Sequence, residues 1–303
     1  MKNYNIIDCL VAIQEELYNR LQEVTTHNYK EYLIYSPQGF EEPLPMVCIH
    51  LDTINTHNSR VLPNKQHFDF VSSTNSFHLS NKGREELACL GGDDRAGLWI
   101  ALQLIDYMES TGNYKYRIGF FLDEEVGCIG SNQFAMDKLP IDTTCYIGLD
   151  RRSYKGRDEV ATYGFDNEQL TIMFEELGYK QTVGSVTDAS TIASFCDIAC
   201  VNLSVGYDNE HTRDEILYCD PMYKTLQVLK DLPKLNTKFE YEPYNYDVEE
   251  YNYYECDDEY LDEYVSDLEH RCSIFEETLS SMGMDIDDVL EQGGYYAIST
   301  TKG

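Results

Sequence analysis

Short apolar runs alternate with helix-like segments between residues 44 and about 237, and this alternation restricts the fold more than any other feature. Four runs indicate buried strands, at 45–51, 116–122, 143–149 and 199–206. Four segments indicate helices, at 94–110, 130–139, 188–196 and 223–232. Continuously apolar strands separated by helices are typical of a parallel sheet that is covered on both faces. We therefore predict a three-layer α/β fold with a mostly parallel central sheet. The polar segment 55–88 between these elements is expected to form a hairpin or a loop excursion.

The N-terminal segment 1–24 has apolar residues at helical spacing and predicts one amphipathic helix, without the apolar core of a secretory signal. No stretch approaches the roughly 18 consecutive apolar residues that a membrane-spanning helix needs. The ten cysteines include no Cys-x-x-Cys pair, and several lie within apolar runs. Such cysteines are typical of free thiols in a reducing compartment. We therefore expect a cytoplasmic protein without a membrane partner.

The chain becomes strongly acidic near its end. Residues 239–264 contain eleven acidic residues, eight tyrosines and no lysine or arginine. This composition predicts a partly disordered or helical C-terminal extension at 238–303, after a catalytic domain at 1–237. A docking segment for a basic partner is the alternative. The formal net charge of −31 disfavours nucleic acid as a partner, because a phosphate backbone is bound through clustered Lys and Arg.

Histidines and carboxylates follow strand after strand. They are His50 and Asp52, then Asp93 and Asp94 before a helix, Glu124 and Glu125, Asp150, and finally His211. In an open α/β sheet, ligands bind at the carboxyl ends of the strands, so we expect these side chains to meet there. Imidazole nitrogen and carboxylate oxygen bind zinc. Two histidines with three carboxylates are enough for two metal ions that share one bridging carboxylate.

The order of "HLDT", "GGDDRAG", "DEEVG", a later lone aspartate and a final histidine resembles the co-catalytic dizinc exopeptidases. That group includes the peptidase T-like, M20, M28 and M42 metallopeptidases, and the resemblance covers roughly residues 44–237. It implies that Asp93 bridges two metal ions. His50 and Asp150 would complete one metal site, and Glu125 and His211 the other.

The resemblance also implies roles for residues beside the metals. Glu124 would act as the general base. Asp52, on the same strand face as His50, would fix the tautomer of that imidazole. The segment "SVTDAS", with Asp188, resembles a Ser-Asp segment before a late helix and is a candidate for substrate binding. M20 enzymes insert a lid domain before the last ligand, but only 61 positions separate Asp150 from His211 (211 − 150), so we expect no lid.

The sequence therefore predicts a metal-dependent hydrolase of amide bonds, an aminopeptidase on short peptides with two divalent ions. Zinc is the expected metal, with cobalt and manganese as alternatives. N-acyl amino acid deacylation and carboxypeptidase activity stay open, with Arg151 and Arg152 holding the substrate carboxylate. A metal-binding scaffold without catalysis, acting through its acidic extension, is a further alternative.

Overall fold

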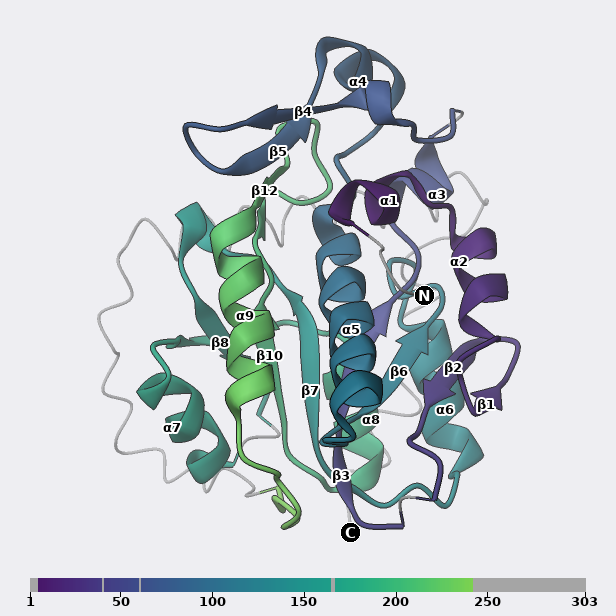
Figure 1. Cartoon of the computed structure of the whole chain (residues 1–303), viewed down its shortest axis with the longest axis vertical. Coiled ribbons are helices and arrows are strands. Elements are labelled where there is room, and N and C mark those ends of the chain that lie inside the picture. Colours follow the sequence, from purple (N-terminus) through teal and green to yellow (C-terminus); the bar gives the residue numbers. More distant parts are fainter. Residues whose placement is uncertain (1–4, 40, 60, 165–166, 242–303) are drawn as a thin grey trace, which may run out of the picture. The chain divides into compact units, whose positions relative to one another are not determined.

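The central layer of the protein is a mixed sheet. The computed structural model describes residues 5–39, 41–59, 61–164 and 167–241 (Figure 1). Its strands within these ranges are β1 (His27–Asn28), β2 (Tyr32–Tyr35), β3 (Leu44–His50), β6 (Arg117–Phe121), β7 (Thr143–Arg151), β8 (Glu159–Thr162), β9 (Lys180–Val183) and β10 (Cys200–Ser204). Their order is β1-β2-β6-β3-β7-β10-β8-β9. The four central strands β6, β3, β7 and β10 are parallel, and the antiparallel pairs lie nearer the edges. The predicted fold class is confirmed.

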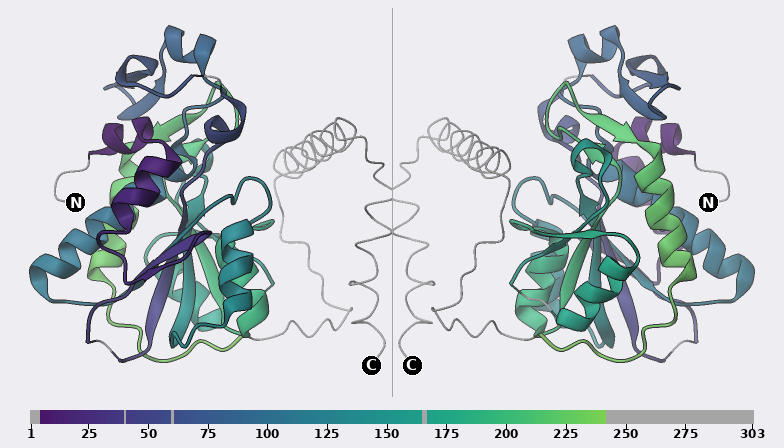
Figure 2. Two further views of the ribbon diagram at one scale, coloured as in Figure 1. Left: turned by 90° about the vertical axis from the view of Figure 1, so that its right-hand side faces the viewer. Right: turned by 90° about the vertical axis from the view of Figure 1, so that its left-hand side faces the viewer.

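Helices cover both faces of this sheet (Figures 1 and 2). One core contains residues of α1 (Ile6–Val11), α2 (Gln14–Leu21), α5 (Gly92–Thr111), α7 (Glu168–Glu176) and α9 (Cys219–Asp231). The core on the opposite face contains residues of α6 (Ile129–Asp137) and α8 (Asp188–Cys196). Because side chains alternate along a strand, Val47 and Ile49 of β3 enter the first core and Met46 and Cys48 the second. Burial on both faces explains the unbroken apolar runs.

The N-terminal segment differs from its prediction, because the structure has two helices in place of one. Ala12 and Ile13 are extended between α1 and α2. The buried guanidinium of Arg95 accounts for the break. It donates through Nη2 to the carbonyl of Ala12 at 3.1 Å and through Nη1 to the carbonyl of Leu51 at 2.6 Å. A buried cation needs such acceptors, and a continuous helix would have used the Ala12 carbonyl itself.

The polar segment 55–88 is the hairpin excursion that the sequence allowed. It contains β4 (Phe68–Val71) and β5 (Ser76–Leu79), with α3 (Ile54–Asn58), the 3-10 turn η1 (Lys65–His67) and α4 (Asn81–Glu86) around them. The hairpin joins β11 (Tyr207–Asp208) and β12 (Ile216–Tyr218) in a second, four-stranded sheet. Because β11 and β12 flank His211, this small sheet supports the loop that carries it.

No inserted lid is present between Asp150 and His211 in the described ranges. The chain there forms the turn η2 (Tyr154–Gly156) and then β8, α7, β9, α8, β10 and β11. None of the described helices combines the length and apolar composition that crossing a membrane requires. The predicted extension lies outside the described residues from residue 242 onward, so the domain division stays a prediction.

Candidate metal centre

Five predicted metal ligands meet at the carboxyl ends of the parallel strands. His50 lies at the end of β3, and Asp150 lies at the end of β7. Asp93 lies at the start of α5, Glu125 in the loop after β6, and His211 in the loop between β11 and β12. The structure therefore brings together side chains that are distant in the sequence, at the sheet edge where the sequence placed them.

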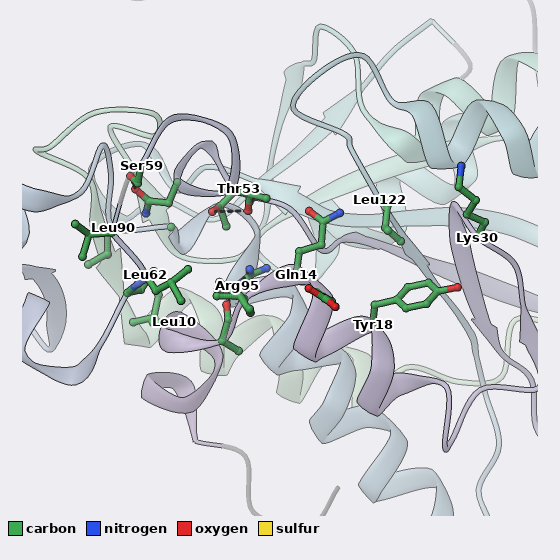
Figure 3. Close-up of a pocket in the computed structure, with 18 residues that line it drawn as sticks. Leu10, Gln14, Tyr18, Lys30, Thr53, Ser59, Leu62, Leu90, Arg95 and Leu122 are labelled. Carbon is green, nitrogen blue, oxygen red and sulfur yellow. Dashed lines mark hydrogen bonds between the residues drawn. The ribbon is translucent and has the colours of Figure 1, made fainter.

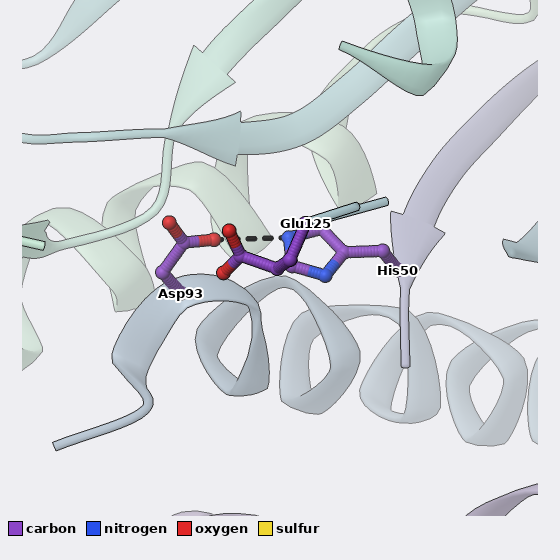
Figure 4. A group of neighbouring side chains, drawn as sticks. All are labelled: His50, Asp93 and Glu125. Atoms are coloured by element: carbon purple, nitrogen blue, oxygen red, sulfur yellow. Dashed lines mark hydrogen bonds and ion pairs between the residues drawn. The ribbon is translucent and has the colours of Figure 1, made fainter. Parts of the chain in front are cut away.

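Asp93 lies between the two histidines. Its Oδ1 is 2.9 Å from His50 Nε2, and its Oδ2 is 3.0 Å from His211 Nε2. Figure 4 shows Asp93 reaching from the start of α5 toward His50, with Glu125 beside them. One carboxylate thus presents a separate oxygen to each imidazole.

Each histidine also faces a second carboxylate. His50 Nε2 is 3.4 Å from Asp150 Oδ1, and His211 Nε2 is 2.9 Å from Glu125 Oε2. The five side chains therefore form two adjoining groups, each of one imidazole and two carboxylates, which share Asp93.

Burial and the surrounding charges shift the pKa values of this centre. Burial opposes protonation of His211, but hydrogen bonds with Asp93 and Glu125 raise its pKa to about 12. Burial acts to raise the pKa of Asp93, yet hydrogen bonds with His211 and His50 hold it below its usual value. Burial raises the pKa of Glu124 well above its usual value, and the nearby acids Asp150 and Asp188 contribute to this rise. The centre therefore brings several acidic side chains close together in a buried environment.

This arrangement fits divalent metal ions. The buried Oε1 of Glu125 has no hydrogen-bond partner among the described residues, and neither has Oδ2 of Asp94. Ligand atoms of His50, Asp93 and Glu125 lie within 4.8 Å of one another, as do those of His50, Asp94 and Asp150. Nitrogen and oxygen donors at such spacing are the ligands that zinc takes in proteins. Asp94, which the sequence analysis left without a role, thus lies among the candidate ligands.

Asp52 lies beside His50, on the side away from Asp93. Its Oδ1 is 3.3 Å from His50 Nδ1. The backbone N–H of Glu124 donates to Oδ1 at 3.0 Å, and that of Glu125 donates to Oδ2 at 3.1 Å. One fully buried carboxylate therefore contacts both the imidazole of His50 and the loop that carries the paired glutamates.

The remaining predicted residues differ in their surroundings. Asp188 begins α8, is buried, and has its pKa raised to about 7 by that burial. Arg151 donates to Glu159 Oε2 through Nη2 at 2.9 Å and Nε at 3.1 Å. Arg152 Nη1 lies 3.6 Å from an oxygen of Glu210. Both predicted carboxylate-binding arginines are therefore paired with acidic side chains of this chain.

A cavity of about 510 Å³ lies beside the centre, between α1, α2 and the segment 53–63 (Figure 3). None of the five candidate ligands lines it. Its wall includes Thr53, Gly91 and Leu122, each within two residues of Asp52, Asp93 or Glu124. The cavity thus adjoins loops that carry candidate site residues.

Residues 38–197 match the family model described as peptidase family M28. The match covers 160 of the 303 residues (197 − 38 + 1), which is more than half of the chain. The chain belongs to peptidase family M28. This membership makes it a metallopeptidase and confirms the resemblance to the co-catalytic exopeptidases. No curated protein matches the sequence.

Solved structures share the fold of this M28 chain at low sequence identity. A TET aminopeptidase from a marine sediment archaeon of the Thaumarchaeota has a TM-score of 0.55 at 11% identity, covering 76% of this chain and 95% of that one. A tripeptidase from Staphylococcus aureus has a TM-score of 0.52 at 13% identity, covering 74% and 96%. The aminopeptidase PepT from Bacillus cereus has a TM-score of 0.50 at 14% identity, covering 74% and 95%.

Three residues that the sequence analysis did not name form hydrogen bonds with the candidate ligands Asp150 and Asp93. The hydroxyl of Tyr207 donates to Asp150 Oδ1 at 3.0 Å, and that of Thr187 donates to Asp150 Oδ2 at 2.9 Å. Buried Glu215 accepts the backbone N–H of Gly91 at 2.8 Å and that of Asp93 at 3.1 Å. Glu215 follows His211 by four positions in "HTRDE", but no local pattern marks it as a partner of a loop 122 positions earlier.

Proposed function

We propose that this M28 peptidase is a two-metal aminopeptidase that acts on short peptides. The observation that carries this proposal is the position of Asp93, whose two oxygens face two histidines of separate ligand groups. Such a shared carboxylate suits two metal ions held close together. Zinc is the proposed metal, because imidazole and carboxylate ligands suit it, and cobalt and manganese can use the same donors.

The proposal gives each ligand group one ion. His50 and Asp150 would hold the first, Glu125 and His211 the second, and Asp93 both. When bound, the ions would polarise the scissile carbonyl and lower the pKa of a water molecule toward neutrality. Asp150 is held in place for this task by hydroxyl groups on both of its oxygens.

Glu124 is the proposed general base. Its carboxylate would take a proton from the attacking water and return it to the leaving amine. Burial raises the pKa of Glu124, which makes its carboxylate a stronger base toward the attacking water. Asp52 fixes the backbone of Glu124 and Glu125 through two hydrogen bonds. It would thereby keep the base and its neighbouring ligand in separate orientations.

Two observations support aminopeptidase activity over the alternatives. The similar structures are those of a TET aminopeptidase, the aminopeptidase PepT and a tripeptidase. Carboxypeptidase or N-acyl deacylase activity would need Arg151 and Arg152 free to hold a substrate carboxylate. Both arginines have acidic partners within this chain.

A cytoplasmic location is part of the proposal and is supported by the eight free cysteines of the described residues.

The test is a digest of a mixed short-peptide library, with free and N-acetylated members, by the zinc-loaded protein. Mass spectrometry would follow the products, and Glu124→Gln would be the matched control because it keeps the size of the side chain. We expect stepwise loss of N-terminal residues with the wild type and a rate lower by about 10²–10⁴-fold with Glu124→Gln. Cleavage only of acetylated members or of C-terminal bonds would favour the alternatives. No cleavage with both metals bound would favour the scaffold alternative.

A further inference from the structure

A third histidine contacts the carboxylate that lies behind the metal centre. His57 Nε2 is 3.1 Å from Asp52 Oδ2, and a quarter of the His57 side chain (27%) is exposed, whereas Asp52 is fully buried. The two residues are only five positions apart, but an extended strand end would carry them away from each other. The short helix α3 (Ile54–Asn58) turns the chain back instead. Thr53 and Thr56 stabilise its first turn, since the backbone N–H of Thr53 donates to Thr56 Oγ1 at 3.1 Å.

The carboxylate of Asp52 has three partners in addition to the imidazole of His50. Its two oxygens accept two backbone N–H groups, from Glu124 and Glu125, and contact the side chains of His50 and His57. On Oδ2, the partners are the Glu125 amide and the ring of His57. Without His57, the amide of Glu125 would be the only group among these to hold that oxygen. Carboxylates behind metal-binding histidines need such partners to keep the imidazole oriented.

A second carboxylate, that of Asp123, lies near the ring of His57. A ring nitrogen of His57, an oxygen of Asp123 and an oxygen of Asp52 lie within 4.8 Å of one another. Gln14 of α2 donates through Nε2 to Asp123 Oδ1 at 3.3 Å, and Gln14 and Thr53 line the same cavity (Figure 3). His57 therefore lies between the Asp52 carboxylate, which it contacts, and a second carboxylate that is bonded to α2.

We propose that His57 is a positioning residue, which orients the Asp52 carboxylate and through it the metal-binding imidazole of His50. His57 itself touches neither substrate nor metal. The inference rests on the proposed role of His50 as a metal ligand. Loss of His57 would weaken the metal site that contains His50. The other site, with Glu125 and His211, would keep its own ligands.

A cation held by Asp52, His57 and Asp123 is the alternative to a hydrogen-bonded His57, because their ligand atoms lie within 4.8 Å of one another. Asp52 Oδ2 already has two donors at hydrogen-bond distance, and Oδ1 has the Glu124 amide and the His50 ring. A cation there would have to displace the His57 contact. The geometry therefore favours a hydrogen-bonded His57, and the number of bound ions distinguishes the two arrangements.

The test is a calorimetric titration of the metal-free full chain with zinc, which does not depend on peptide cleavage. Its variants are His57→Ala, His57→Gln, and His27→Ala as a control on the edge strand β1. We expect His57→Ala to bind the same number of ions, one of them about 10-fold more weakly, at the lower end of the range for partners of metal-binding histidines. His57→Gln keeps an N–H donor and is expected to restore most of that affinity. His27→Ala is expected to match the wild type.

Three results would overturn the inference. The first is wild-type affinity at both sites in His57→Ala. The second is loss of one bound ion with the other affinities unchanged, which would place a cation on His57 itself. The third is a lower melting temperature of the metal-free His57→Ala protein without rescue by His57→Gln, which would indicate a general structural defect. A wild-type protein that binds two ions but cleaves no peptide would contradict only the proposed function.

Discussion

Two buried carboxylates, Asp52 and Glu215, hold the loops that carry the candidate ligands. Asp52 accepts the backbone amides of Glu124 and Glu125, and Glu215 accepts those of Gly91 and Asp93. Each uses both of its oxygens for this purpose. A buried amide left without an acceptor costs free energy, so these carboxylates fix the loop backbone as well as the side chains next to it.

We predict that Glu215→Gln weakens both metal sites, because Asp93 belongs to both. A glutamine offers one acceptor oxygen, so its NH₂ group would face one of the two backbone amides. We expect the free energy of unfolding to fall by about 1–3 kcal/mol, the cost of one unpaired buried group. Urea denaturation and a zinc titration would measure the two effects. Glu176→Gln on the exposed side of α7 is the control, and equal behaviour of the two variants would refute the prediction.

The sequence analysis identified side chains that lie at the ends of their own strands. It missed side chains whose role is to contact a loop that is distant in the sequence. His50, Asp93, Glu125, Asp150 and His211 follow apolar runs or precede a helix, and a parallel sheet brings such positions together. Tyr207 and Glu215 are ordinary residues of their local sequence. Their importance arises from contacts with Asp150 and with the Gly91–Asp93 loop, which only the folded chain creates.

The helix α5 lies unusually close to the strand β7. The backbone N–H of Gly97 donates to Asp94 Oδ1 at 2.9 Å, and a Cβ added at Gly97 would overlap the carbonyl oxygen of Leu149. Leu149 directly precedes Asp150. The contact therefore sets the distance between the loop of Asp93 and the strand that delivers Asp150.

We predict that Gly97→Ala pushes α5 away from β7 and disturbs the metal centre. Overpacking of a buried contact costs typically about 1–3 kcal/mol, and we expect a loss of unfolding free energy in this range. Zinc affinity should fall together with stability. Ser110→Ala near the exposed end of the same helix is the control, and a Gly97→Ala protein as stable as this control would contradict the prediction.

Elements were predictable where the apolar pattern was continuous. The segment 188–196 coincides with α8, and the segment 94–110 lies within α5, whose backbone is non-helical at Asp93 and Asp94. The strands β2, β8 and β9 and the helix α7 were not predicted. β8 begins with the buried residue Glu159, so its residues form no continuous apolar run. The ion pair of Glu159 with Arg151 offsets the cost of burying this carboxylate. A four-residue strand whose buried charge is paired with a residue of another strand has no periodic signal of its own.

At the scale of the whole molecule, the fold gathers acids that repel one another. Burial raises the pKa values of Asp94, Glu124, Glu125, Asp150 and Asp188, and neighbouring carboxylates add to each rise. Bound cations would offset this repulsion, since an ion that binds only the folded state stabilises it.

We predict that removing metal with a chelator lowers the melting temperature and that zinc restores it. Each ion at about 100 times its dissociation constant would add about 2.7 kcal/mol to the free energy of unfolding. Differential scanning fluorimetry over a zinc series would measure the shift. In Asp93→Asn the shift should largely disappear, because both ligand groups lose a charged ligand. A melting temperature of the wild type that does not depend on zinc would count against the metal centre.

Backbone hydrogen bonds continue past residue 237, where the composition predicts the end of the catalytic domain. Residues 239 and 240 both take part in them. The N–H of Phe239 donates to the carbonyl of Thr144 at 2.8 Å, and Phe239 O accepts the N–H of Ala199 at 3.0 Å. Asn167 Nδ2 donates to the carbonyl of Glu240 at 3.1 Å. These bonds tie the segment to β7, to the start of β10 and to α7.

We predict that a chain ending at residue 241 keeps the stability and zinc affinity of the full chain, whereas a chain ending at 237 loses stability. The shorter chain lacks three hydrogen bonds and the packing of Phe239 against the core. At about 0.5–1.5 kcal/mol for each bond, the three bonds account for a loss of about 1.5–4.5 kcal/mol. Urea denaturation of the three proteins would measure it. Equal stability of the two shortened chains would place the boundary at 237, as the composition alone suggested. A defect in both would mean that the acidic extension contributes to the fold of the catalytic unit.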